Sequence, residues 1–179
     1  MISINNELYL QPVLISDSRK LIVLMREIYT PAYSHFWKDG GNWYIDSQYS
    51  EAFLENEFLD PKARSYFIVY KGEIIGNFRF IWGEKLSGVS EEKQVKLHRL
   101  YLHPKTHGNG IGKIMLSWLT EKAVQNNYQM IWLDAMNEKT QAFEFYKKLG
   151  FQYFSHTFLD FKYMLDEVRK MSQLVKKLD

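Results

Sequence analysis

The segment at residues 99–112, RLYLHPKTHGNGIG, constrains the fold more than any other part of this chain. Its first four residues alternate with the period of a strand that buries one face. Pro104 ends that strand because proline cannot donate a ladder hydrogen bond. Three glycines then lead into apolar residues at helical spacing, which are Ile111, Ile114, Met115, Trp118 and Leu119. A glycine turn that enters a helix predicts an anion site, because free N–H groups and the positive end of the helix dipole converge there.

Two common glycine loops do not fit this segment. A Walker A loop needs glycine five residues before Gly112, where His107 stands, and Ser or Thr after Lys113, where isoleucine stands. The dinucleotide fingerprint needs a third glycine in place of Lys113 and an acidic residue after a second strand. This chain has neither of them. The spacing that remains is Gly110-x-Gly112 after a strand that ends near Leu102.

A second pattern follows about 35 residues later. The run MIWLD at 130–134 suits a buried strand, and AFEFYKKLGF at 142–151 predicts an amphipathic helix that ends at Gly150. Phe143, Tyr146 and Leu149 share one face of this helix. The physical interpretation is a capped helix between two strands.

Together the two patterns resemble the GNAT superfamily of N-acyltransferases. Its first motif, Q/R-x-x-G-x-G/A, is similar to residues 107–112 except at the first position, where His107 stands. Its second motif, F/L-Y-x-x-x-G-F, is similar to residues 145–151, in the family's order and separation. The resemblance implies the GNAT fold, a mixed α/β (α+β) architecture. Its central twisted mixed sheet would have about six to seven strands, with helices on both faces.

The rest of the chain fits one N-acetyltransferase domain over residues 1–179, in the order β-α-α-β-β-β-α-β-α-β. Strands are predicted at 7–14, 66–70, 74–82 and 95–102. A first helix begins at Asp17 or Ser18 and is disrupted at Thr30-Pro31. A second helix is predicted from about Ser47 to Leu59, and the tail at 166–179 is predicted to be helical.

The resemblance implies that acetyl-CoA binds along the first motif. Backbone groups of the strand would hold pantetheine and polarise the thioester carbonyl, and the glycine loop would hold the pyrophosphate. A further departure lies at Lys139, where many members have asparagine; Asn137 would compensate if the loop slips, and its role stays open. The residues predicted to contact the cofactor are Leu100, Tyr101, Leu102, His107, Gly108, Asn109, Gly110, Ile111, Gly112, Lys113 and Asn137.

Two residues are candidates for proton transfer. By resemblance, Tyr146 is the general acid for the departing thiolate, since a phenol donates a proton without being ionised at neutral pH. His98 is the best candidate for the base; the alternative is a sheet histidine without a catalytic task. Pro104 interrupts the segment that carries His98, His103 and His107, and no carboxylate cluster accompanies them, so no metal is expected.

The acceptor must be inferred from the N-terminal half. Its aromatic cluster from Tyr33 to Tyr49 suits an apolar or cationic group, and its acidic residues suit a polycation. The alternative is a core cluster beside a solvated helix face. The whole layout resembles the bacterial polyamine acetyltransferase branch, which implies transfer of acetyl to a primary amine such as spermidine in a ternary complex. A protein N-terminus or lysine as acceptor, or a CoA-binding regulatory module without catalysis, remain alternatives. The acidic residues are Glu51, Glu55, Glu57 and Asp60.

Composition restricts the cellular location and the partners that we expect for such an enzyme. The chain has no cysteine, no apolar run of about 20 residues and no basic-then-apolar start, so a cytoplasmic location is expected. A net charge of +2 spread along the chain gives no case for nucleic acid or membrane partners. The expected partner is a small amine substrate, and the resemblance makes a homodimer one expectation for the assembly.

Overall fold

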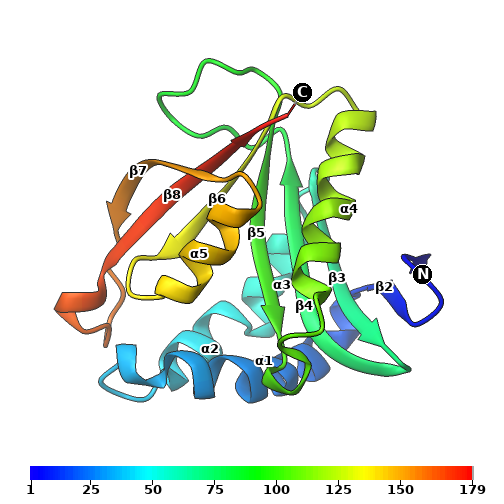
Figure 1. The fold of residues 1–179 in the computed structure, drawn as a ribbon. Helices are drawn as coiled ribbons and strands as arrows, with labels where there is room; N and C mark the ends of the chain where they lie inside the picture. The colour runs from blue at the N-terminus through cyan, green and yellow to red at the C-terminus, as the bar shows by residue number, and fades with distance from the viewer. Residues whose placement is uncertain (179) are drawn as a thin grey trace.

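Residues 1–178 form one eight-stranded sheet. Figure 1, which draws the computed structural model, shows helices on both faces of this sheet. The structure describes residues 1–178. The mixed α/β class is confirmed, with eight strands in place of six or seven. The strands are β1 (Ile2–Ser3), β2 (Leu8–Pro12), β3 (Ala63–Tyr70), β4 (Glu73–Trp82), β5 (Gln94–Leu102), β6 (Met130–Met136), β7 (Gln152–Phe158) and β8 (Lys170–Lys177). The helices are α1 (Ser18–Tyr33), α2 (Asn42–Gln48), α3 (Glu51–Phe58), α4 (Ile111–Gln125) and α5 (Thr140–Lys148).

The sheet changes direction at its centre. Its spatial order is β1-β2-β3-β4-β5-β6-β8-β7, and all neighbours are antiparallel except β5 and β6, which run parallel. The parallel pairing ends where Leu97 lies opposite Leu133. β5 continues along β4 to Leu102. Residues 98–102 therefore leave the edge that faces β6 unpaired.

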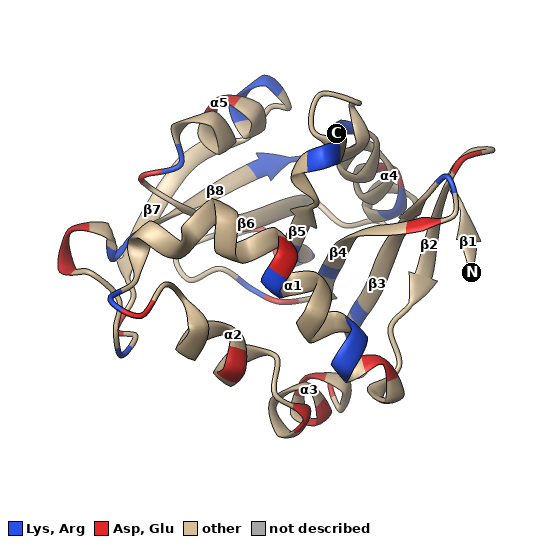
Figure 2. Ribbon diagram, turned by 90° about the horizontal axis from the view of Figure 1, so that it is seen from below, with Lys and Arg blue, Asp and Glu red and all other residues tan. Residues whose placement is uncertain are grey.

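The strands bury both faces, because successive side chains of a strand point to opposite sides. On one face Ile68 and Phe78 pack with Met115 of α4. On the other face Phe67 packs with Met25 of α1. Helices α4 and α5 therefore cover one side of the sheet and α1, α2 and α3 cover the other (Figures 1 and 2).

Two details of the N-terminal helices correct the prediction. The first helix does not end at Thr30-Pro31 but runs to Tyr33. Pro31 lies in the last turn, where its missing N–H leaves only the carbonyl of exposed Glu27 without a helical donor. The helix predicted over 47–59 is two helices, because Ser50 begins α3 with its Oγ accepting from the Phe53 N–H at 3.3 Å.

The helix predicted at 166–179 is wrong for residues 166–178, and residue 179 lies outside the described residues. Residues 166–168 form one 3-10 turn, and the next residues form β8, which lies between β6 and β7. Val168, Met171 and Val175 have helical spacing, but Ser172 and Leu174 are the buried residues of the strand. The unpaired edges of β6 and β7 supply backbone partners that the local pattern does not reveal.

Gly76 allows β4 to approach the end of β5. It pairs with Leu102, and a Cβ built on Gly76 would lie 2.5 Å from the backbone oxygen of Tyr101. The obstacle is backbone, so a side chain at this position requires one of the two strands to move. Position 76 therefore helps to set where the last residues of β5 lie.

Candidate active site

A bulge at His98 bends β5 at the point where it leaves β6. Phe80 pairs with Leu97 and Arg79 pairs with Arg99, so His98 is the extra residue on β5. A bulge increases the local twist and redirects the strand after it. The backbone of residues 99–102 therefore diverges from β6, and space opens between the two strands.

A buried ion pair ties this part of β5 to α3. Arg99 donates from Nη1 to Glu57 Oε2 at 2.6 Å and from Nη2 to Oε1 at 2.9 Å. Only 5% of the Arg99 side chain and 11% of the Glu57 side chain are exposed. Arg79 adds its Nε at 3.7 Å from the same carboxylate. Buried charges persist only when they are paired, and the bidentate form is the strong one.

His98 is held in the neutral form by its surroundings. Its Nδ1 accepts a hydrogen bond from Arg79 Nη1 at 2.5 Å. Burial, followed by the charges of Arg99, Arg79 and Lys96, lowers the pKa of His98 to about 2. A general base works best with a pKa near the operating pH, so this arrangement does not favour the base role predicted from sequence.

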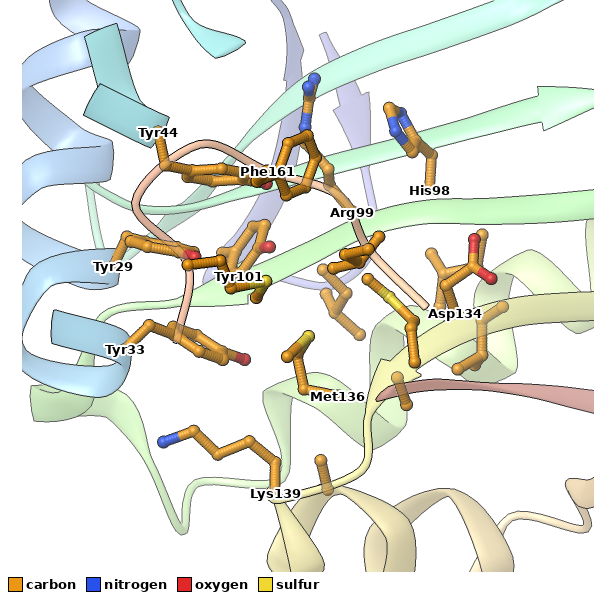
Figure 3. Close-up of a pocket in the computed structure, with 18 of the residues that line it drawn as sticks. Tyr29, Tyr33, Tyr44, His98, Arg99, Tyr101, Asp134, Met136, Lys139 and Phe161 are labelled. Carbon is orange, nitrogen blue, oxygen red and sulfur yellow. The ribbon is translucent and has the colours of Figure 1, made fainter. Parts of the chain in front are cut away.

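A cavity of about 110 Å³ opens where β5 and β6 separate (Figure 3). Its walls come from α1, α2, β5, β6, α5, β8 and the loop between β7 and β8. Of the predicted site residues, this cavity brings together His98, Leu100, Tyr101 and Tyr146. The strand before the glycine loop and the second motif therefore meet in one cavity, although they lie far apart in the sequence.

Tyr146 reaches the cavity from α5. Its ring packs edge-on against Phe145 at 5.2 Å and Phe151 at 5.6 Å between ring centres. Burial, with a smaller effect from Tyr33, raises the pKa of Tyr146 above its ordinary value. The phenol therefore keeps its proton at neutral pH and is a donor, which matches the predicted role of general acid.

The glycine loop presents open space and free donors together. Gly108 and Gly110 have φ of +84° and +72°, and a Cβ on either would meet no atom within 4 Å. Gly110 caps the start of α4. Within the described chain, the N–H groups of Ile111, Gly112 and Lys113 donate no hydrogen bond. Such donors at a helix start suit the pyrophosphate of CoA.

Gly112 has a different role from its two neighbours. A Cβ there would lie 3.2 Å from Phe145 Cζ, so the absence of a side chain lets α4 pack against α5. The loop and the helix of the second motif are therefore in contact. Glycine at position 112 serves packing, whereas glycine at 108 and 110 serves backbone conformation and access.

Three further residues predicted to contact the cofactor, which are His107, Asn109 and Asn137, do not line the cavity. His107 is exposed, and its Nε2 lies 3.2 Å from the carbonyl oxygen of Leu102, so the ring closes the loop onto β5. Asn109 lies in the same loop, with its N–H directed at the Thr106 carbonyl at 3.4 Å. Asn137 accepts from Ser172 Oγ at 3.2 Å, which turns its side chain toward β8 and away from the cavity.

Lys139 takes a position that sequence reasoning left open. Its Nζ donates to the carbonyl of Ala32 near the end of α1. The same ammonium lies 4.6 Å from the ring centre of Tyr33 and 5.5 Å from that of Phe36. Burial lowers the pKa of Lys139. Lys139 therefore joins the start of α5 to the end of α1 along the wall of the cavity.

The sequence indicated only some of the other residues that line the cavity. Tyr44 belongs to the aromatic cluster noticed in the sequence, whereas Tyr29 and Phe161 carry no local signal because only the fold brings them to the cavity. Among residues 1–178, no group of three or more His, Cys, Asp or Glu side chains could hold a metal ion. No helix in that range is both long and apolar enough to cross a membrane.

The sequence matches the model of the acetyltransferase (GNAT) family over residues 22–151. It is also 26% identical over 109 residues to an uncharacterized N-acetyltransferase of Mycobacterium bovis. This alignment covers 61% of the chain and 65% of the mycobacterial protein, so the chain spans less than two thirds of that relative.

Solved structures share the fold over almost the whole chain. The PaiA N-acetyltransferase of Thermoplasma acidophilum, solved with coenzyme A, gives a TM-score of 0.69 at 19% identity and covers 95% of this chain and 98% of its own. A spermidine N-acetyltransferase SpeG chimera from Vibrio cholerae and hSSAT gives 0.66 at 15% identity and covers 96% of each chain. At such identities the likeness concerns the fold.

We expect the His98 imidazole to remain neutral from pH 8 to below pH 4, as followed by its ring resonances in NMR. The folded pKa of about 2 lies below the ordinary 6.5, so the unfolded chain binds the extra proton between these values. His98 therefore contributes stability above pH 6.5 that is lost as the pH falls toward 2. His98→Asn should make stability less dependent on pH in that window. A titration midpoint near 6.5 would contradict this and restore His98 as a base.

Proposed function

Because the chain belongs to the acetyltransferase (GNAT) family, we propose that it transfers an acetyl group from acetyl-CoA to a primary amine. The amine attacks the thioester directly while both substrates are bound. The observation that carries the proposal is the cavity between β5 and β6, where unpaired strand backbone and the Tyr146 phenol line the same space. Its lining combines Tyr146 of the second motif with Leu100 and Tyr101 of the strand that precedes the first motif.

The residues present fit acetyl-CoA. The open glycine loop and the free N–H groups at the start of α4 would hold the pyrophosphate. The edge of β5 at residues 98–102 would pair with the amide groups of pantetheine, as a strand pairs with a neighbour. When bound, acetyl-CoA supplies an activated acyl group as a thioester.

The chain's own groups then serve three needs of acyl transfer. Free N–H groups on the β6 side of β5 stabilise the negative charge that develops on the carbonyl oxygen. Tyr146 donates its phenolic proton to the departing thiolate sulfur. Among the described residues that line the cavity, Asp134 is paired with Lys96 at 3.0 Å and His98 with Arg79. The proton of the amine therefore leaves to solvent.

A polyamine is one acceptor to consider, because a spermidine enzyme shares the fold. The acidic side chains predicted to attract it do not line the cavity. Glu51 and Glu55 are exposed on α3. Figure 2 shows α1 between α3 and α5. Glu57 is committed to Arg99 and Arg79. The local charge therefore gives a polycation little support.

Release of the CoA thiol from acetyl-CoA, measured with a panel of primary amines and one peptide with a free N-terminus, tests the function. We expect saturable release with at least one small amine. Release with the peptide alone would indicate a protein acetyltransferase. Calorimetric binding of acetyl-CoA without turnover for any acceptor would overturn the proposal and favour a regulatory module.

Tyr146→Phe should lower kcat by roughly 10²-fold with little change in the Kd for acetyl-CoA, because general acid catalysis contributes on the order of 10² or more. The ring and its packing are retained, so the fold should persist. Tyr153→Phe, which removes a hydroxyl from an exposed tyrosine on β7, is the control and should leave kcat unchanged. Wild-type turnover in Tyr146→Phe would assign Tyr146 a structural role.

Gly110→Ala should raise the Kd for CoA at least about tenfold, equivalent to about 1.4 kcal/mol. The new methyl enters the space where the pyrophosphate would approach. Gly83→Ala is a matched control, because Gly83 has φ of +71° and open space like Gly110 but lies outside the loop. Calorimetry of both variants separates the two effects, since backbone strain is common to them. Equal Kd values would show that the loop does not contact CoA.

A further inference from the structure

One side of the cavity is built from aromatic rings (Figure 3). The ring of Tyr29 stacks on Tyr33 with centres 4.6 Å apart and on Tyr44 with centres 4.7 Å apart. Phe161 meets Tyr44 edge-on at 5.7 Å, and Tyr101 meets Tyr29 edge-on at 6.1 Å. These rings come from α1, α2, β5 and the loop after β7. An added ring could continue their stacked and edge-on arrangement.

Sulfur atoms line the remaining space between these rings and the sheet. Met136, Met164 and Met171 contribute to the cavity wall. Methionine is flexible and polarizable and makes favourable contacts with aromatic rings. The wall therefore adapts to a flat apolar group.

The charges of the cavity are unbalanced toward positive. Asp134 is its one carboxylate among the described residues; it pairs with Lys96 and also accepts from Gln173 Nε2 at 3.3 Å. Figure 3 shows Asp134 across the cavity from Tyr29 and Tyr33. Arg99 is neutralised by Glu57, whereas no ion pair within residues 1–178 includes Lys139. The ammonium of Lys139 is held by the Ala32 carbonyl and by the rings of Tyr33 and Phe36, and among the described residues no carboxylate neutralises it.

The size of the cavity also limits the acceptor. Its volume is about 110 Å³. This is less than the roughly 150 Å³ of an apolar cavity that holds one benzene molecule, so the cavity can enclose no group larger than a single ring. A chain with several hydrated charges would also lose water on entering a space of this size, which a compact acceptor with one amine avoids.

We propose that the acceptor is a monoamine on a compact aromatic body, which packs against Tyr29, Tyr44 and Phe161, and that Lys139 disfavours acceptors with a second positive charge. This inference rests on the proposed function and names its substrate class. A second ammonium would lose water without gaining a carboxylate and would be repelled by Lys139, at close range in a poorly solvated site. Neutral tyrosine hydroxyls suffice to orient a single amine.

Wild-type thiol release with 2-phenylethylamine, butylamine and spermidine tests the substrate class. We expect kcat/KM for 2-phenylethylamine to exceed that for spermidine at least about tenfold and to exceed that for butylamine as well. The reaction forms the amide bond, breaks the thioester and releases one CoA thiol per acetyl group. A spermidine value equal to or above that of 2-phenylethylamine would overturn the inference.

Variants at position 139 test the role of the lysine. The ratio of kcat/KM for spermidine to that for 2-phenylethylamine should rise from wild type to Lys139→Met and again to Lys139→Glu, by about tenfold in total. Lys62→Glu makes the same charge change on an exposed residue outside the cavity and should leave the ratio unchanged. Equal ratios in wild type and both Lys139 variants, with thermal unfolding showing folded protein, would remove Lys139 from acceptor selection.

A binding measurement separates this inference from the proposed function. Calorimetry with CoA-saturated protein should show tighter binding of 2-phenylethylamine than of spermidine. If this order holds but no amine releases thiol, the transferase function fails while the aromatic pocket stands. If spermidine or only a peptide is acetylated, the transferase function stands and the aromatic acceptor fails.

Discussion

The parallel pairing of β5 with β6 ends at Leu97 opposite Leu133, and the whole site depends on this early end. Continued pairing would use the backbone of residues 98–102 in the sheet and close the space between the strands. The bulge at His98 turns β5 aside, and the buried pair of Glu57 and Arg99 holds the turned segment against α3. The bidentate contact between Arg99 and Glu57 offsets the cost of burying their charges. This ion pair therefore helps to keep the end of β5 apart from β6.

Much of the fold was predictable because its information is local. The strand, glycine turn and helix around Gly110 follow from turn chemistry and periodicity within a short segment, and so does the helix that ends before Gly150. The structure of the tail was not predictable in this way. Val168 and Met171 have helical spacing, but the unpaired edges of β6 and β7 favour a strand between them. Pairing with distant strands outweighed the local pattern.

The site divides in the same way. Tyr146 was found because it belongs to the second motif, and Leu100 and Tyr101 because they lie on the strand before the first. The cavity brings the three together. The position of Lys139 could not be found, since its ammonium meets a carbonyl 107 residues earlier in the chain. The neutral state of His98 depends likewise on Arg79, which only the register of β4 with β5 places beside it. Contacts between distant segments set the chemistry of residues whose identity is visible locally.

The close approach of Gly76 to the carbonyl of Tyr101 extends the site beyond its visible walls. Gly76 lines no part of the cavity, yet its missing side chain lets a neighbouring strand hold the reactive edge in place. A library that randomises only the lining residues would leave this dependence undetected. Attempts to change the acceptor by redesign should therefore keep glycine at position 76, because the position of β5 against β4 sets the width of the cavity.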